Sequence, residues 1–194
     1  MDKKSFLQAG HTPTLLAAFL YFDLAFMVWV LLGPLGIGIA KDLGLSHAEK
    51  GLMVATPVLA GALLRIVMGI LVDRLSPKKA AIIGQVVVIA AMLYAWLVGV
   101  HSYTEVLVLG VFLGVAGSSF AAALPLASRW YPAEHQGTAM GIAGAGNSGT
   151  ALAALFAPGL AAAFGWTNVF GIVLIPLVLV LIAFIFMAKD APDA

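Results

Sequence analysis

Six long apolar stretches separated by short polar segments constrain this chain of 194 residues more than any other feature. Each is long enough to cross a bilayer, which takes about 20 mostly apolar residues. Lipid offers no partner to backbone N–H and C=O groups, so each span is expected to be a helix. The predicted spans cover residues 14–39, 50–72, 80–100, 105–128, 138–164 and 169–188. The sequence therefore predicts an all-α integral membrane protein, a six-transmembrane-helix bundle in which residues 1–194 form a single membrane domain.

The composition excludes most soluble functions. Hydrophobic residues make up 62% of the chain and charged residues 10%, whereas a soluble domain carries about 25% charged residues. Soluble enzymes and nucleic-acid-binding proteins are therefore excluded. The chain has no cysteine, which excludes disulfides and cysteine-ligated metals. It also has no zinc, serine-hydrolase or phosphate-loop motif, so we expect no enzyme activity, no cofactor and no metal site.

Lysine and arginine are distributed unequally between the two predicted sides of the membrane, with seven on one side and two on the other. The seven are Lys3, Lys4, Arg74, Lys78, Lys79, Arg129 and Lys189. Because positive residues favour the cytoplasmic side, we expect a multi-pass protein of the cell inner membrane with both termini cytoplasmic. The first stretch contains Asp23 and is too long for a cleavable signal peptide, so it is expected to remain as a span.

Local signals mark some helix ends. Ser46 and Glu49 have the spacing of a capping box at the start of the second helix. Thr104, followed by Glu105, is predicted to be the N-cap of the fourth helix. The tryptophans are expected to form an interfacial belt near span ends, and they are Trp29, Trp96, Trp130 and Trp166.

Two ionisable residues lie well within predicted spans, Asp23 in the first and Arg65 in the second. A charge in hydrocarbon is costly unless it is paired or faces a wet cavity, so such residues are functional candidates. A rise of about 1.5 Å per residue puts both, together with Asn147, in one layer near the midplane, where transporters bind substrate. Two interpretations stay open. Arg65 and Asp23 form a neutralising pair, or Arg65 binds an oxyanion with its planar guanidinium.

Small residues recur every fourth position in the fourth and fifth spans. They are Gly110, Gly114, Ser118 and Ala122 in one and Gly137, Gly141, Ala145, Gly149 and Ala153 in the other. Such stripes are typical of close helix packing. The run around Asn147, which includes Gly144 and Gly146, goes beyond packing because it is expected to expose the amide of Asn147 to a cavity. Asp73 and Arg74 follow the second span, where they act either as breakable contacts between helix ends or as a simple positive-inside anchor.

Four segments resemble the nitrate/nitrite porters of the major facilitator superfamily. The loop Gly69-x-x-x-Asp73-Arg74-x-x-Pro77-Lys78 is similar to the loop motif of that superfamily, with Ser76 where glycine is usual. Residues 141–150 are similar to the porters' fifth-helix nitrate signature. Gly114-Val-Ala-Gly117-Ser-Ser-Phe120 resembles their fourth helix, and Gly61-Ala-Leu-Leu-Arg65 resembles their second.

The resemblance implies transport of nitrate, nitrite or both by alternating access, without a cofactor. It implies that Arg65 grips the anion, that Phe120 packs against it and that Asn147 donates a hydrogen bond to it, with Gly144 and Gly146 in the same binding signature. Asp73 and Arg74 belong to the cytoplasmic gate in this reading. Asp23 is grouped with the gate and coupling residues but has no matching role in the family. Exchange of nitrate for nitrite and proton-coupled uptake both occur among these porters.

The chain departs from these porters in length. They have twelve spans in two related halves, and the six spans here resemble the N-terminal half of a major-facilitator fold. We therefore expect a half-size subunit that forms a homodimer or pairs with a separate C-terminal half. A parallel two-fold dimer would place two copies of Arg65 across one cavity. The alternatives are a truncated, regulatory or assembly partner that does not transport, and a carrier of another small anion.

Overall fold

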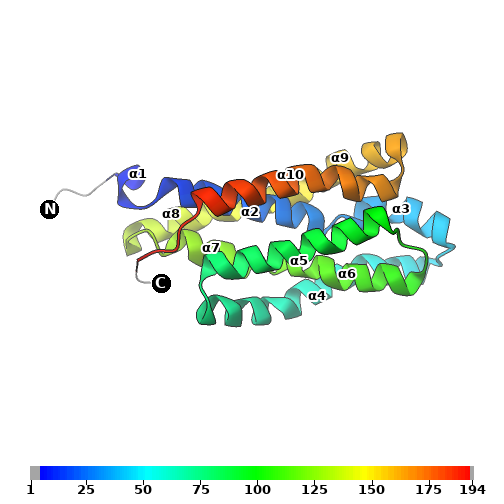
Figure 1. Ribbon diagram of the computed structural model, residues 1–194, viewed down its shortest axis with the longest axis horizontal. Helices are drawn as coiled ribbons and strands as arrows, with labels where there is room; N and C mark the ends of the chain where they lie inside the picture. The colour runs from blue at the N-terminus through cyan, green and yellow to red at the C-terminus, as the bar shows by residue number, and fades with distance from the viewer. Residues whose placement is uncertain (1–4, 193–194) are drawn as a thin grey trace.

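The computed structural model describes residues 5–192, and these residues form helices and no strand. The elements are α1 (Phe6–Ala9), α2 (Thr12–Trp29), α3 (Leu32–Leu43), α4 (His47–Arg74), α5 (Pro77–Leu97), α6 (Tyr103–Gly117), α7 (Phe120–Ser128), α8 (Ala133–Gly144), the 3₁₀ turn η1 (Ala145–Ser148), α9 (Gly149–Phe164) and α10 (Trp166–Met187). They run along one long axis, and both ends of the chain lie at the same end of the bundle (Figure 1). Lys3 and Lys4, which contribute to the predicted orientation, lie outside the described residues.

Six segments are long and apolar enough to cross a membrane, which confirms the all-α membrane fold. They are Thr12–Leu43, His47–Arg74, Pro77–Leu97, Tyr103–Ser128, Ala133–Phe164 and Trp166–Met187. Each overlaps one predicted span. The largest difference is in the fifth, predicted from residue 138, because its helix already begins at Ala133. Polar first turns such as the one containing Glu134 are helical, so these helices extend beyond the apolar residues that predicted them.

Three of the six spans are interrupted. The first breaks between Trp29 and Leu32, ahead of Pro34, because proline has no N–H and its ring displaces the carbonyl four residues earlier. The fourth breaks after Gly117, where the hydroxyl of Ser118 donates to the carbonyl of Val115 over 2.6 Å, a contact that bends helices. The fifth tightens into η1 within its glycine-rich run.

The small-residue stripe of the fourth span packs α6 against α4. A Cβ atom on Gly114 would lie 2.6 Å from Cβ of Ala60 and 2.8 Å from the backbone nitrogen of Gly61. A Cβ atom on Gly110 would lie 3.3 Å from Cδ of Pro57. Gly114 permits a backbone approach that a side chain would block, and Gly110 lies in tight contact, so the predicted packing role is confirmed for these positions.

The stripe of the fifth span divides into two faces. A Cβ atom on Gly146 would lie 2.6 Å from Cδ1 of Phe22, and one on Gly149 would overlap the carbonyl of Asp23. Gly137 and Gly141 would meet no atom within 4 Å. A 3₁₀ turn places residues i and i+3 on one side, so η1 turns Gly146 and Gly149 toward α2. Among residues 5–192, Gly137 and Gly141 pack against no other helix of this chain, so their predicted packing role stays a prediction.

The predicted capping box is confirmed, and the other predicted cap is wrong. The hydroxyl of Ser46 accepts from the backbone N–H of Glu49, and the carboxylate of Glu49 accepts from the backbone N–H of Ser46, both over 3.1 Å. At the fourth span, the N-cap is Ser102 rather than Thr104, and its hydroxyl accepts from Glu105 N–H over 3.2 Å. The capping oxygen lies three residues before Glu105, as N-cap geometry requires.

Side-chain contacts tie the two ends of the chain together. The hydroxyl of Thr14 accepts from Lys189 N–H over 2.9 Å, and the indole of Trp130 donates to the Lys189 carbonyl over 2.7 Å. The ring of His11 stacks on Trp130 with centroids 4.9 Å apart. The carboxylate of Asp190 accepts from the backbone N–H of Lys78 over 3.0 Å, so it caps α5. These contacts hold α2, α5, the α7–α8 connection and the segment after α10 at one end.

Candidate functional site

Arg65 lies half-buried on α4 and is held by two other elements. Its Nε donates to the carbonyl of Gly117 over 3.2 Å. Its guanidinium carbon lies 5.5 Å from the ring centre of Trp29 and 5.2 Å from that of Phe120. These distances are within cation–π range. Among residues 5–192, no other hydrogen bond to the guanidinium occurs, so its two terminal amino groups are available to a ligand.

Asp23 does not pair with Arg65. Its carboxylate accepts a hydrogen bond from the hydroxyl of Ser148 over 2.8 Å, and only 7% of the residue is exposed. Within the described part of the chain, Arg65 has no carboxylate partner within salt-bridge distance. The interpretation of a neutralising Arg65–Asp23 pair is therefore not supported by this arrangement, and Arg65 keeps its positive charge for another partner.

Aromatic rings form a connected cluster next to Arg65. The ring centres of Phe26 and Trp29 are 4.7 Å apart, and those of Phe22 and Phe26 are 4.2 Å apart. Phe120 joins from α7, with its ring centre 5.9 Å from that of Phe22. Phe120 is 40% exposed, so a ligand of Arg65 can reach one face of its ring.

Asn147 lies exposed on η1, next to Ser148. Its backbone carbonyl accepts from the hydroxyl of Thr150 over 2.9 Å, which orders the turn, and its side-chain amide has no protein partner among residues 5–192. A Cβ atom on Gly144 would meet no atom within 4 Å, so this glycine leaves open space on the same turn. Gly146 packs against α2 instead and positions the turn rather than lining its open side.

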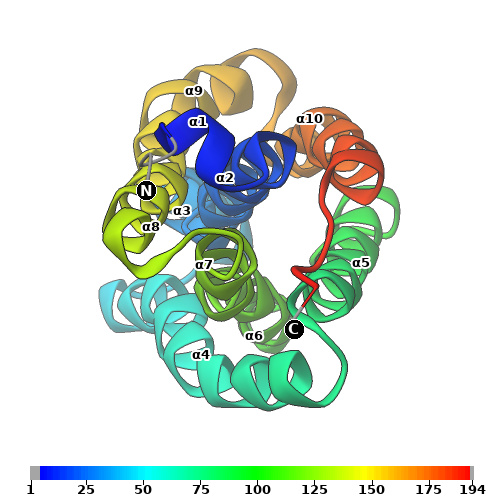
Figure 2. The ribbon, with the colours of Figure 1, turned by 90° about the vertical axis from the view of Figure 1, so that its left-hand side faces the viewer.

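The Arg65 group and η1 are joined through α2. Phe22 contacts Phe120, the ring next to Arg65, and it also lies against Gly146. Seen along the bundle, α4 and α8 flank α7 on one side of the molecule (Figure 2). Arg65 and Phe120 therefore contact each other, and Phe22 links them to η1, the turn that carries Asn147. Beyond Trp29, a hollow of about 290 Å³ between α3, α4 and α9 extends the same region.

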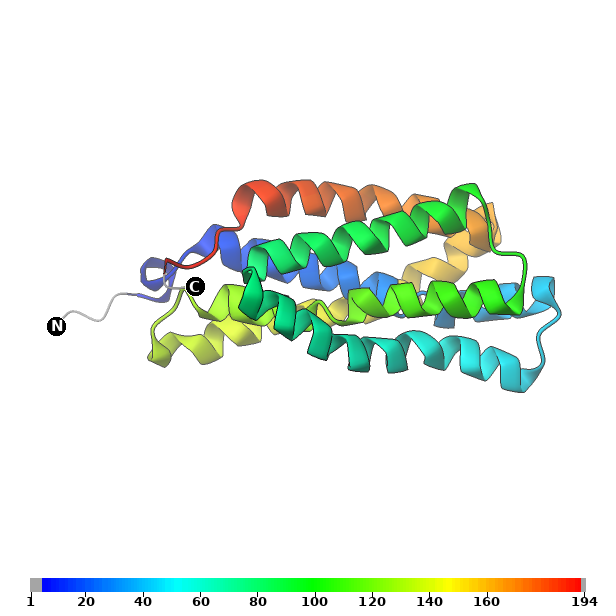
Figure 3. The same cartoon turned by 60° about the horizontal axis from the view of Figure 1, so that its bottom comes forward.

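Asp73 and Arg74 lie exposed at the end of α4, away from this cluster. Neither makes an ion pair or a hydrogen bond through its side chain among residues 5–192. The loop that follows turns directly into α5, as the view in Figure 3 makes visible. Their predicted role in a gate stays a prediction.

Trp29 was predicted to lie in an interfacial belt, but its indole lies between α2, α4 and α6 beside Arg65. Ser148, the partner of Asp23, was not predicted as a site residue. The glycines at positions 61 and 117, which leave room for the indole, are the signal that could have indicated its burial. Trp96 and Trp166, in contrast, do lie at helix ends.

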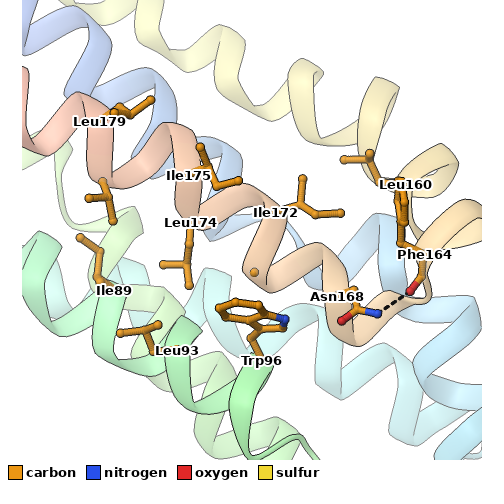
Figure 4. A pocket seen from close by; sticks show the side chains of 12 residues that line it. Ile89, Leu93, Trp96, Leu160, Phe164, Asn168, Ile172, Leu174, Ile175 and Leu179 are labelled. Carbon is orange, nitrogen blue, oxygen red and sulfur yellow. Dashed lines mark hydrogen bonds between the residues drawn. The ribbon is translucent and has the colours of Figure 1, made fainter.

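A wide crevice between α5, α9 and α10 does not suit an anion. It has a volume of about 770 Å³. Its lining is aliphatic and aromatic apart from Asn168, whose amide donates to the Phe164 carbonyl over 2.7 Å (Figure 4). No charged residue lines it, so volume does not identify the polar site in this protein. The described residues also contain no group of three or more His, Cys, Asp or Glu able to hold a metal ion.

Comparison with known proteins agrees with this arrangement of helices. Residues 15–194 match the model of the Major Facilitator Superfamily. The chain is 38% identical over 187 residues to the probable nitrate/nitrite transporter NarK2 of Mycobacterium tuberculosis, covering 94% of this chain and 47% of that protein. It is 36% identical over 143 residues to the nitrite extrusion protein of Bacillus subtilis, covering 74% of this chain and 36% of that protein. A solved bacterial homologue of the human lysosomal transporter Spinster, inward-facing and unoccupied, matches with a TM-score of 0.79 and 20% identity, covering 100% of this chain and 45% of that chain.

The fold is the multi-pass helical fold of a membrane protein. The chain belongs to the Major Facilitator Superfamily. The resemblance to nitrate/nitrite porters on which the sequence analysis relied is confirmed by relatives that carry that name. The chain spans about half the length of the curated relatives it matches.

Proposed function

We propose that this chain carries nitrate, nitrite or both across the membrane by alternating access, with Arg65 as the anion ligand. The observation that carries the proposal is a guanidinium without a carboxylate partner in the described chain, held over aromatic rings with its terminal amino groups available. Nitrate is planar and matches the planar fork of arginine. The similarity to a probable nitrate/nitrite transporter and to a nitrite extrusion protein supports the same substrates.

Phe120 and Asn147 complete the proposed ligand set. The exposed face of Phe120 packs against the plane of the anion, and the amide of Asn147 donates to an anion oxygen. Gly144 keeps the space next to Asn147 open, and Gly146 contributes by seating η1 on α2. Asp73 and Arg74 act in the cytoplasmic gate. Asp23 couples anion transport to the binding or release of a proton. Its carboxylate is buried and hydrogen-bonded to Ser148, so its protonation can change during transport.

A second set of six spans completes the cavity, supplied by a second copy of this chain or by a separate C-terminal half. Burial within the chain supports this requirement. Within the most apolar part of the first span, 72% of the residues are buried inside the chain. The corresponding share is 22% for α4 and 17% for the fifth span. The two least buried spans are those that carry Arg65 and Asn147. The positive-inside bias supports an inner-membrane setting with both termini cytoplasmic.

Nitrate binding measured by calorimetry on the chain in lipid nanodiscs tests the proposal. Wild type is expected to bind nitrate in preference to chloride. Arg65→Lys should bind nitrate about 10- to 100-fold more weakly, because an ammonium lacks the bidentate fork. Arg129→Lys is the matched control, since Arg129 is exposed at a helix end. Equal nitrate affinity in wild type and Arg65→Lys would exclude Arg65 as the ligand.

A further inference from the structure

The indole of Trp29 occupies a slot between three helices. Its Nε1 donates to the carbonyl of Pro57 on α4 over 2.7 Å. A Cβ atom on Gly61 would lie 2.7 Å from that nitrogen, and a Cβ atom on Gly117 would overlap the indole ring. A proline inside α4 and glycines on α4 and α6 therefore create a place that fits this side chain.

Gly117 serves Arg65 and Trp29 together. Its carbonyl accepts the hydrogen bond from Nε of Arg65, and its missing side chain admits the ring over which the guanidinium of Arg65 lies. Trp29 thus contacts the cation on one side and is fixed by the Pro57 carbonyl on the other. Phe120, the other ring near the cation, is 40% exposed and has no polar atom to anchor it.

We propose that Trp29 is a positioning residue for Arg65. It holds the guanidinium plane so that the terminal amino groups point toward the open side of the bundle, by which we mean the little-buried face of α4 and of the fifth span. The inference rests on the proposed function, because the held geometry matters only if Arg65 binds an anion. An arginine side chain loses much rotamer freedom when a ligand fixes it. A ring that fixes it beforehand removes that loss from the binding step, so affinity rises without a new contact to the anion.

The chain offers a direct probe, because it contains three arginines, Arg65, Arg74 and Arg129. In protein labelled with ¹⁵N-arginine, the Nε–H signal that disappears in Arg65→Lys belongs to Arg65. We expect this signal to be shifted by the indole ring in wild type and to move toward the other two arginine signals in Trp29→Leu. Trp29→Phe keeps an aromatic face and should retain part of the shift, which separates loss of the ring from loss of the fold.

Trp96→Leu is the matched control. Trp96 also fills the space left by a glycine, since a Cβ atom on Gly171 would lie 2.6 Å from its Nε1, but it lies between α5 and α10. We expect nitrate binding about ten-fold weaker in Trp29→Leu, less affected in Trp29→Phe and unchanged in Trp96→Leu.

The outcomes separate the two proposals. An unchanged Arg65 signal with unchanged nitrate affinity in Trp29→Leu would overturn the positioning role. Equal effects of Trp29→Leu and Trp96→Leu would also overturn it, because they would indicate general loosening. If wild type binds no nitrate while the Arg65 signal still depends on Trp29, the proposed function fails and the positioning of Arg65 stands.

Discussion

Arg65 combines a membrane-embedded charge with a set of partners that stabilise it without neutralising it. One carbonyl, that of Gly117, accepts from Nε, and the rings of Trp29 and Phe120 lie within 5.5 Å of the guanidinium carbon. Aromatic faces attract a cation through their quadrupole, with a gain of up to about 2 kcal/mol when water is excluded. A carboxylate partner would have cancelled the charge, whereas this environment leaves it for an anion.

Asn147 provides a test at the same scale. Asn147→Leu should weaken nitrate binding about ten-fold, because a hydrogen bond to an anion contributes about 1.5–3 kcal/mol. Thermal stability should stay unchanged, since the side chain is exposed. Calorimetry with nitrate and chloride measures the change in selectivity. Asn168→Leu is the control, because that amide bonds the Phe164 carbonyl near the opposite end of the bundle. Unaltered discrimination between the two anions in Asn147→Leu would remove this amide from the site.

At the scale of the helix, η1 converts a run of small residues into a contact with α2. Gly149→Ala should destabilise the protein by about 1–3 kcal/mol, because its Cβ atom would overlap the backbone of Asp23. Gly159→Ala on the same helix should be neutral or slightly stabilising, since no atom lies within 4 Å of the added carbon. Unfolding in mixed micelles measures both. Equal stability of the two variants would contradict the close contact between α9 and α2.

The N-terminal end of α2, which His11 caps, should become less stable in acid. Burial, together with the nearby charge of Lys189, lowers the pKa of His11. The folded state therefore favours the neutral ring, whose Nδ1 accepts from Thr14 N–H over 3.2 Å. When the start of α2 unfolds, His11 regains its ordinary pKa of about 6.5 and binds a proton more readily than in the folded protein. The contribution of the neutral ring to stability is therefore present above about pH 6.5 and is lost as the pH falls through the lowered pKa.

Hydrogen exchange at the Thr14 amide measures this effect. Exchange should accelerate on acidification beyond the intrinsic pH dependence. His11→Asn keeps a residue suited to the N-cap but cannot titrate, so it should abolish the additional acceleration. The same acceleration in that variant would show that another group is responsible.

The apolar stretches predicted the number of spans, because length and hydropathy are local properties of the sequence. The breaks within spans were not predicted, since they depend on single residues such as Pro34 and Ser118 in their tertiary setting. Arg65 and Asn147 were predicted as polar residues at mid-depth of one site, and their shared role stays a prediction; the structure links the Arg65 group to η1 through Phe22. Trp29 was misassigned because its indole is enclosed by Gly61 on α4 and Gly117 on α6. The sequence does not show that these two glycines lie next to Trp29 in the folded chain.

At the scale of the whole molecule, we propose that a partner covers the open side, the little-buried face of α4 and of the fifth span. The chain has no cysteine, so single cysteines can be introduced cleanly. If two copies meet across the open side, Gly141→Cys on α8 should cross-link with a bismaleimide in liposomes, because Gly141 faces away from the chain's own helices. Leu179→Cys on α10, which is 61% exposed and borders the apolar crevice, should not. Equal cross-linking at both positions would contradict a defined dimer, and none at either would leave a separate second half as the partner.

We propose that Arg65 binds the anion that this chain carries across the membrane. The most direct test is nitrate uptake into liposomes that contain only this protein and are loaded with nitrite. If two copies of this chain form the transporter, we predict saturable uptake by wild type and by Arg129→Ala, and no uptake by Arg65→Ala. In that case, mixing wild type with Arg65→Ala should reduce uptake more steeply than in proportion to the wild-type fraction, because the two copies of the proposed dimer would share one cavity. Uptake by Arg65→Ala at the wild-type rate would contradict the account.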